Sequence, residues 1–293
     1  LEKIRVEEVI KKIMERNKTI EDSQEWLKEA YLSLKIKNLN DIPKENYRNY
    51  KKFLDNDTAY IIVHPAYYTF FQNPGILSSK EDAVVFPKKN LVERFYDKTS
   101  FFDRPMKILQ EQERLLRDFI ELMSTDEKLI IIILPRDYRI YLGCGYINGL
   151  DEYARYINEV TNQSKSVIYV ESSEWNLGTL LDGDLKILLS FMDEVGAKSV
   201  MLGGGYVGRC LEDFYIDIQS KFGFNRVYLV PEITGISPED LSDKWCDTLL
   251  TNSGRLNMKA ATLNLKLPNA YGKQKIIPKV KNLPFSFYSR KTN

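Results

Sequence analysis

Five short apolar runs, separated by segments of helical periodicity, constrain the fold of this chain more than any other feature of its sequence. The runs lie at 59–63, 129–134, 166–170, 199–202 and 226–230, and each has the length of a buried β-strand. Strands that are apolar on both faces are typical of a parallel sheet covered by helices. We therefore expect an α/β fold, with a parallel sheet of five or six strands covered by helices on both faces.

Between these runs, apolar residues recur at the spacing of one helix face. Four segments show this spacing, namely 108–123, 153–160, 185–192 and 211–222. Gly223 follows the last of them, where a glycine commonly ends a helix. Residues 71–105 show no clear period, and we expect a long insertion there, after the first strand.

The two ends of the chain differ from this central part. Residues 1–56 are rich in Lys and Glu and have apolar residues at helical spacing, so we expect an N-terminal helical segment. Residues 57–250 form the expected α/β domain. In residues 251–293 the periodicity fades, and we expect an extended, basic C-terminal segment.

The positive charge of the chain is concentrated near its C-terminus. From Arg255 to Asn293 there are nine Lys or Arg and no Asp or Glu, which leaves 33 basic against 41 acidic residues, a net charge of −8, for the rest. Such a segment suits an anionic partner, such as phosphates, an anionic membrane surface or an acidic protein. Nucleic-acid binding through its lysines and aromatic rings is a further alternative, against which the whole-chain charge of +1 argues. The simplest interpretation is that the segment wraps around its own acidic body.

The cysteines and the single histidine exclude several kinds of site. Cys144, Cys210 and Cys246 form no CxxC pair and are too few for a disulfide framework. His64 is the single histidine, which excludes HExxH zinc sites and His-rich metal centres, although carboxylate-only metal binding stays open. No apolar run approaches about 18 residues, so no transmembrane segment is expected. The first residue is Leu1 rather than Met, and the first residues indicate no cellular compartment.

Candidate functional residues follow the ends of the expected strands, where open parallel sheets bind ligands. His64 follows the first strand, Arg136 the second, and Glu171 ends the third. After the fourth strand, the stretch 203–210, GGGYVGRC, is expected to pass through a Gly-rich turn into a helix that begins near Cys210.

Cys210 has the sequence setting of a reactive cysteine. A helix N-terminus and the neighbouring Arg209 would both favour thiolate over thiol. The same setting is suited to binding a phosphate or carboxylate, and an inert, buried Cys210 is the structural alternative. Thiol, imidazole and carboxylate at one sheet edge are the parts of a nucleophile, a base and an orienting group. We therefore predict that Cys210 is the nucleophile, His64 the base and Glu171 the residue that orients the imidazole.

Residues 200–232, with a strand, a Gly-rich turn, a cysteine, a helix and a second strand, resemble the nucleophile segment of the isochorismatase-like cysteine hydrolases, the superfamily that includes nicotinamidase. The strand that leads into His64 and the strand VIYVE, followed by Gly178 and Thr179, are similar to other parts of that family. The resemblance covers about residues 58–240. It implies hydrolysis of an amide or related C–N bond of a small-molecule substrate without a cofactor, often in a homo-oligomer.

The chain departs from the family at two catalytic positions. His64 stands where the family has an Asp, Glu171 stands near the family Lys, and the histidines of the family metal site are missing. The resemblance implies that the N–H groups of Tyr206 and Cys210 form the oxyanion hole and that the Gly205–Tyr206 peptide is cis.

Seven residues then make up the expected site. The catalytic residues are Cys210, His64 and Glu171, and the substrate-binding residues are Gly205, Tyr206, Arg209 and Arg136. Two functions remain open. The first is a hydrolase with an altered Cys–His–Glu triad, which we favour at this point. The second is a catalytically inactive isochorismatase-like domain that binds a ligand or a protein.

Overall fold

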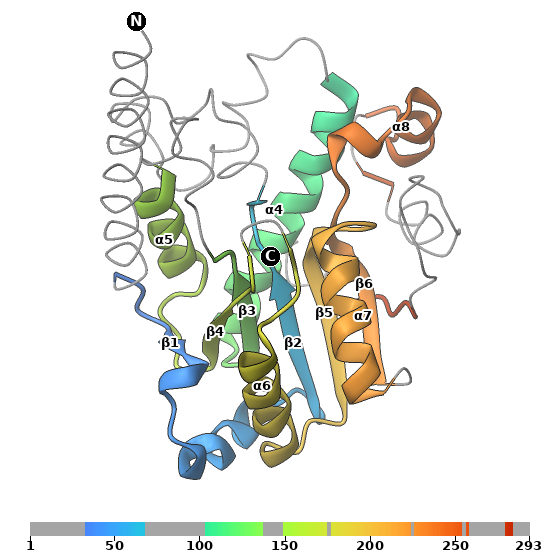
Figure 1. Cartoon of the computed structure of the whole chain (residues 1–293). Helices are drawn as coiled ribbons and strands as arrows, with labels where there is room; N and C mark the ends of the chain where they lie inside the picture. The colour runs from blue at the N-terminus through green and yellow to red at the C-terminus, as the bar shows by residue number, and fades with distance from the viewer. Residues whose placement is uncertain are drawn as a thin grey trace, which may run out of the picture.

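A six-stranded parallel sheet forms the centre of the molecule, with the strand order β1-β4-β3-β2-β5-β6 (Figure 1). The computed structural model describes residues 33–67, 103–136, 149–174, 177–223, 226–253, 256–257 and 279–283. The strands are β1 (Lys37–Asn38), β2 (Thr58–Val63), β3 (Ile130–Leu134), β4 (Val167–Glu171), β5 (Ser199–Tyr206) and β6 (Val227–Gly235). The expected parallel α/β fold is thus confirmed.

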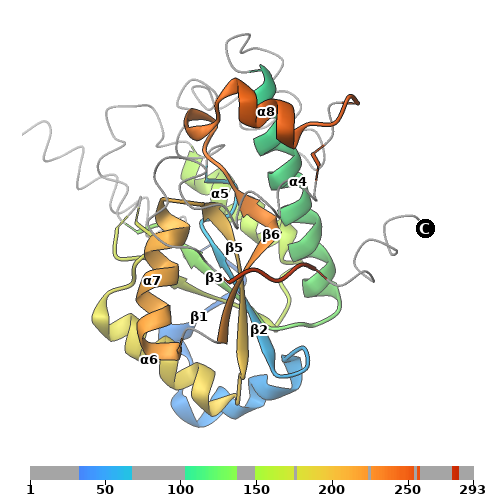
Figure 2. The same ribbon diagram turned by 90° about the vertical axis from the view of Figure 1, so that its right-hand side faces the viewer.

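Helices cover both faces of the sheet (Figure 2). The α-helices are α4 (Asp103–Thr125), α5 (Gly149–Val160), α6 (Asp182–Glu194), α7 (Cys210–Phe222) and α8 (Asp243–Leu249). The described residues also form the 3-10 helices η1 (Leu39–Asp41), η2 (Lys44–Phe53) and η7 (Pro238–Asp240). Figure 2 shows α6 and α7 on one side of the sheet and α4 on the other. Within the described residues, no helix combines the length and the hydropathy needed to cross a membrane.

Alternate residues of the central strands enter two separate cores. In β2, Ile61 and Val63 pack with the apolar residues of α6 and α7, whereas Tyr60 and Ile62 pack with those of α4 and α5. All six residues of β2 are buried. Because successive side chains of a strand point to opposite faces, burial on both faces requires the unbroken apolar runs seen in the sequence.

The strand order reverses between β2 and β5. From β2 the sheet grows through β3 to β4 on one side, and the chain then crosses back to place β5 and β6 on the other side. Open parallel sheets bind ligands at the carboxyl ends of the strands beside such a reversal. In this chain that position lies between His64, after β2, and Tyr206, at the end of β5.

Residues 37–53 contribute a strand to the sheet and 3-10 helices to the layer that covers it. We had expected amphipathic helices in this segment. Strand β1 pairs with β4, and the 3-10 helix η2 packs Tyr47 and Tyr50 edge-on against Phe191 of α6, with ring centroids 5.1 and 5.4 Å apart. Tyr47, Tyr50 and Phe53 are the buried residues of η2, and their spacing of three is the period of a 3-10 helix. Residues 1–32 and the insertion expected at 71–105, up to residue 102, lie outside the described residues.

A short stretch of the basic C-terminal segment, residues 279–283, runs alongside β6. Leu229 N–H donates to Lys279 O at 2.7 Å, and Lys281 N–H donates to Leu229 O at 3.0 Å, as in a parallel strand pair. In this stretch the basic segment packs against its own chain. The rest of the segment beyond residue 257 lies outside the described residues.

Candidate functional site

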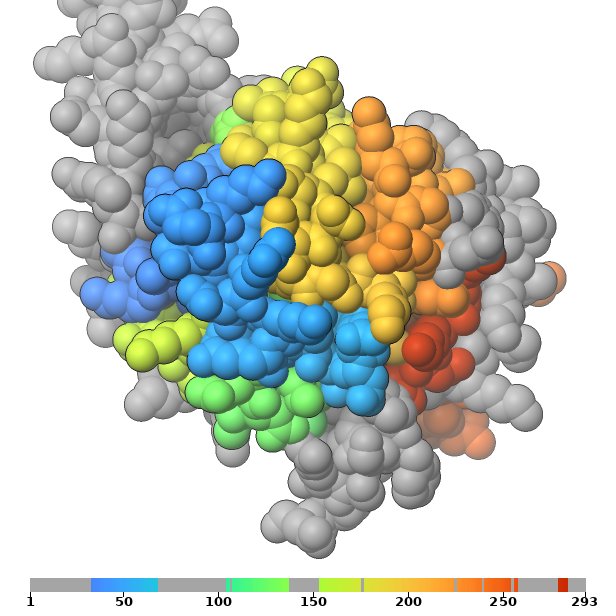
Figure 3. Space-filling model, turned by 90° about the horizontal axis from the view of Figure 1, so that it is seen from below, coloured from blue at the N-terminus to red at the C-terminus, as the bar shows by residue number. Residues whose placement is uncertain are grey.

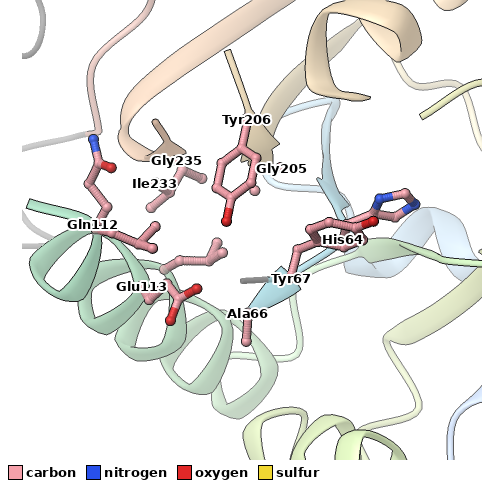
Figure 4. Close-up of a pocket in the computed structure, with 12 residues that line it drawn as sticks. His64, Ala66, Tyr67, Gln112, Glu113, Gly205, Tyr206, Ile233 and Gly235 are labelled. Carbon is pink, nitrogen blue, oxygen red and sulfur yellow. The ribbon is translucent and has the colours of Figure 1, made fainter. Parts of the chain in front are cut away.

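His64 lies at the reversal of the strand order, in an unusual backbone conformation. Its φ is 45°, and that of Ala66 is 53°, both in the left-handed region that residues other than glycine rarely adopt. Strained backbone of this kind is concentrated at functional sites. The imidazole is buried and stacks on the ring of Tyr67 with centroids 5.3 Å apart (Figure 4), and Tyr67 in turn lies edge-on to Tyr206 at 6.2 Å.

Ser172 determines which nitrogen of His64 carries the proton. Its Oγ lies 3.2 Å from His64 Nε2, 2.5 Å from the carbonyl oxygen of Glu174 and 3.3 Å from the backbone nitrogen of Arg136. A carbonyl can only accept, so the single hydroxyl proton of Ser172 goes to Glu174. His64 Nε2–H therefore donates to Ser172, and Nδ1 is the unprotonated acceptor. Within the described residues, His64 Nδ1 has no hydrogen-bond partner.

The imidazole of His64 is neutral at physiological pH. Burial lowers its pKa to about 3, because the charged form is poorly solvated at this position. The proton acceptor Nδ1 is therefore available at neutral pH. An acceptor of such low pKa, however, is a weak general base.

Cys210 is the first residue of α7, and its side chain is buried. It is 3% exposed and belongs to the core under α6 and α7, whereas Tyr67 and Tyr206 belong to the core on the other face of the sheet. Burial raises the pKa of the thiol to about 11. The backbone N–H groups of Tyr206, Leu211 and Cys210 hydrogen bond the sulfur and oppose this rise, but they do not overcome it.

The backbone around the sulfur includes the two N–H groups of the expected oxyanion hole. The N–H groups of Tyr206 and Cys210, which were expected to form that hole, are directed at the Cys210 sulfur. The Gly205–Tyr206 peptide is trans, since the described residues contain no cis peptide bond. The expected cis peptide is therefore wrong for this structure, whereas the oxyanion hole stays a prediction.

Arg209 lies beside Cys210 in sequence, but its guanidinium binds a carboxylate of η7. Arg209 Nε and Nη2 donate to the two carboxylate oxygens of Asp240 at 2.8 and 3.2 Å. The Asp240 side chain is 2% exposed, so this bidentate pair is largely withdrawn from solvent. The pair ties the start of α7 to η7, and it occupies the group that we had predicted to bind substrate.

Glu171 and Arg136 form a second cluster on the carboxyl edge of the sheet. Arg136 Nε donates to Glu171 at 3.3 Å, and Arg136 Nη2 donates to Asp184 of α6 at 2.8 Å. Asn40 completes the cluster by donating to Asp184 at 3.0 Å. Burial raises the pKa of Glu171, while Arg136 acts in the opposite direction. Glu171 thus pairs with Arg136, and Ser172 takes the place beside His64 that we had predicted for Glu171.

The glycine run belongs to β5 itself and not to the turn that we had expected. A Cβ atom on Gly204 would lie 2.2 Å from the carbonyl oxygen of Val63, and one on Gly203 would lie 2.6 Å from Ile233 Cδ1. Gly204 also has a φ of +80°, and the pairing of β5 with β6 is bulged here. The glycines therefore allow β5 to pack closely between β2 and β6.

The carboxyl ends of β2, β5 and β6 and the helix α4 enclose a cavity of about 20 Å³ (Figure 4). Its lining includes His64, Tyr67, Glu113, Tyr206 and Gly205. Figure 4 shows the Tyr206 hydroxyl and the Glu113 carboxylate directed into the space between α4 and the strands. A cavity of this volume has room for about one water molecule.

Comparisons of the chain with protein-family models, with curated proteins and with solved structures found no match. The described residues contain no group of three or more His, Cys, Asp or Glu side chains arranged to hold a metal ion.

The positions of the seven predicted residues define the candidate site. All seven predicted residues lie at or beside the carboxyl edge of the sheet, but they are divided among several clusters. His64 lies with Tyr206 and Gly205, Glu171 with Arg136, and Arg209 with Asp240. Cys210 begins α7 and its side chain enters the core on the other face of the sheet.

Five residues of these clusters were not among the predicted site residues, namely Ser172, Tyr67, Asp184, Asn40 and Asp240. Ser172 and Tyr67 follow strand ends, which is a positional signal, but neither belongs to a catalytic motif. Asp184 lies in the first turn of α6, and no sequence signal relates it to Arg136.

Proposed function

We propose that this chain is a catalytically inactive α/β module that binds a small-molecule ligand or a protein partner. The observation that carries the proposal is the separation of Cys210, His64 and Glu171, each of which has partners outside the expected triad. The proposal corresponds to the second of the two functions left open by the sequence.

Nucleophilic catalysis requires a base within hydrogen-bond reach of the nucleophile. The partners of the Cys210 sulfur are backbone N–H groups, which cannot accept its proton. His64 directs its N–H to Ser172, and its acceptor Nδ1 has no partner in the described part of the chain. A thiol with a pKa of about 11, whose hydrogen-bond partners in the described part of the chain are backbone N–H groups, supports the inactive alternative.

The size of the cavity beside His64 supports the same proposal. Pockets for small-molecule ligands usually have volumes of about 300–1,000 Å³. The cavity has about 20 Å³, well below that range. If the chain is a divergent relative of the isochorismatase-like hydrolases, as its sequence suggests, we propose that it has kept the fold and lost the reaction.

Ammonia release tests the proposal. The full chain and its Cys210→Ser variant are incubated with nicotinamide and a panel of small aliphatic and aromatic amides. We expect no release above that of Cys210→Ser, whose folding is checked by circular dichroism. Release by the natural chain that disappears in Cys210→Ser would restore the hydrolase alternative.

A further inference from the structure

A second hollow lies at the opposite end of the sheet, beside the amino ends of β4 and β1. It has a volume of about 440 Å³, within the range of small-molecule sites. Its walls are the stretch around β1, the helices η1 and η2, and the turn between α5 and β4. Figure 3 views this end of the molecule and shows the segment 33–67, in blue, bordering the yellow-green residues near 160.

Four lysines line the hollow, and their charges are not compensated. Lys35, Lys37, Lys52 and Lys165 face one acidic residue, Asp41. Among the described residues, none of these four ammonium groups forms an ion pair. Like charges gathered around one hollow repel each other, so an anion bound between them would be stabilised.

Two lysines near the amino ends of β3 and β5 are paired. Lys198 contacts Asp57 at 2.7 Å, and Lys128 contacts Asp55 at 3.2 Å. Up to residue 254 the chain has more acidic than basic residues. Four lysines around one hollow therefore contrast with the excess of acidic residues in this part of the chain.

The hollow also offers apolar and amide groups. Ile42, Tyr50 and Phe53 contribute apolar wall, and the Lys52 ammonium lies 4.8 Å from the centroid of the Phe53 ring. Asn46 and Asn49, which hydrogen bond each other at 3.3 Å, supply polar groups at the rim. This combination suits a ligand with a charged group and an apolar or planar body.

We infer that the hollow binds a small organic phosphate. A phosphate monoester carries a charge of about −1.5 to −2 on three oxygens, so several ammonium groups can share it. Lysine ammonium groups bind phosphate as compact point charges. The remaining body of the ligand would lie against the apolar wall. The inference gives the proposed binding module a site and a ligand class, but it depends on no residue of the carboxyl edge.

Calorimetric titration of the full chain with ADP tests the inference, with adenosine and pyrophosphate as partial ligands. We expect ADP to bind at least about tenfold more tightly than either, because only ADP provides both phosphate and a planar body. The variant K37Q/K165Q should weaken ADP binding by at least about tenfold. The control K186Q/K221Q removes the same charge from exposed positions on α6 and α7 and should change the Kd by less than about twofold.

Several outcomes would overturn the inference. The first is that ADP does not bind. The second is that adenosine or pyrophosphate binds as tightly as ADP. The third is that K37Q/K165Q and the control variant weaken ADP binding equally. None of them concerns the Cys210 thiol, and ammonia release reports on that thiol alone. Failure of this site and failure of the inactive-module proposal are therefore distinguishable.

Discussion

At the scale of single residues, burial determines the chemistry of the two groups that the sequence made most conspicuous. Cys210 and His64 are 3% and 1% exposed. Burial disfavours the charged form of each, so the pKa of the thiol rises to about 11 and that of the imidazole falls to about 3. Both groups are therefore neutral at pH 7, unlike the two members of a thiolate–imidazolium pair.

The lowered pKa of His64 makes the stability of the fold depend on pH. In the unfolded chain the imidazole binds a proton below about pH 6.5, whereas in the folded chain it stays neutral until about pH 3. The unfolded state therefore gains protons first, and the free energy of unfolding falls as the pH falls from 6.5 toward 3. From pH 7 to pH 5 the loss due to His64 is about 2 kcal/mol.

The variant His64→Gln removes this titration and keeps an amide N–H for Ser172. We expect its free energy of unfolding in urea to fall by about 2 kcal/mol less between pH 7 and pH 5 than that of the natural chain. Equal losses in the two proteins would show that the imidazole does not titrate as its burial implies.

At the scale of elements, the sequence predicted the sheet well, because burial on both faces leaves an unbroken apolar run for each central strand. The strand expected at 59–63 is Thr58–Val63, and that expected at 166–170 is Val167–Glu171. Strands β5 and β6 extend to Tyr206 and Gly235, beyond the expected ends at residues 202 and 230. A glycine run has no apolar signal, and the close approach of neighbouring backbones that keeps it in β5 depends on tertiary packing.

Gly204→Ala tests this account of β5. The added Cβ would meet the Val63 carbonyl oxygen at 2.2 Å, at a backbone φ of +80°. We expect a loss of about 3 kcal/mol or more in the free energy of unfolding. Gly183→Ala, in the first turn of α6 with no atom within 4 Å of the added Cβ, should be neutral or slightly stabilising. Similar thermal midpoints for the two variants would contradict the account.

At the scale of the whole molecule, the sequence placed the candidate residues at one sheet edge but could not pair them. Strand ends are encoded locally by the apolar runs. The partners Ser172 of His64, Asp184 of Arg136 and Asp240 of Arg209 are chosen by the packing of segments far apart in the chain. The lysine-lined hollow depends on tertiary structure in the same way, since its walls come from two distant segments.

The C-terminal stretch contributes to the stability of the molecule through a buried carboxylate. Glu232 of β6 is 2% exposed, and its Oε1 accepts from Asn282 Nδ2 at 2.8 Å and from Leu283 N–H at 3.2 Å. Asn282→Ala removes one of these donors and should lower the free energy of unfolding by about 1–3 kcal/mol. Asn252→Ala, at an exposed turn after α8, should change it by less than about 0.5 kcal/mol. Urea unfolding of both variants makes the comparison, and an unchanged Asn282→Ala would mean that this contact contributes nothing.

We conclude that Cys210 is a buried, protonated thiol, and the pH dependence of its alkylation by iodoacetamide tests this claim. The rate is measured by mass spectrometry in the folded chain and in urea. At pH 8 we predict that Cys210 reacts at least about a hundredfold more slowly in the folded chain, because a pKa near 11 leaves little thiolate and burial limits access. Folded-state alkylation as fast as in urea, with a midpoint below about pH 8.5 that shifts in His64→Gln, would contradict the claim and indicate a working nucleophile.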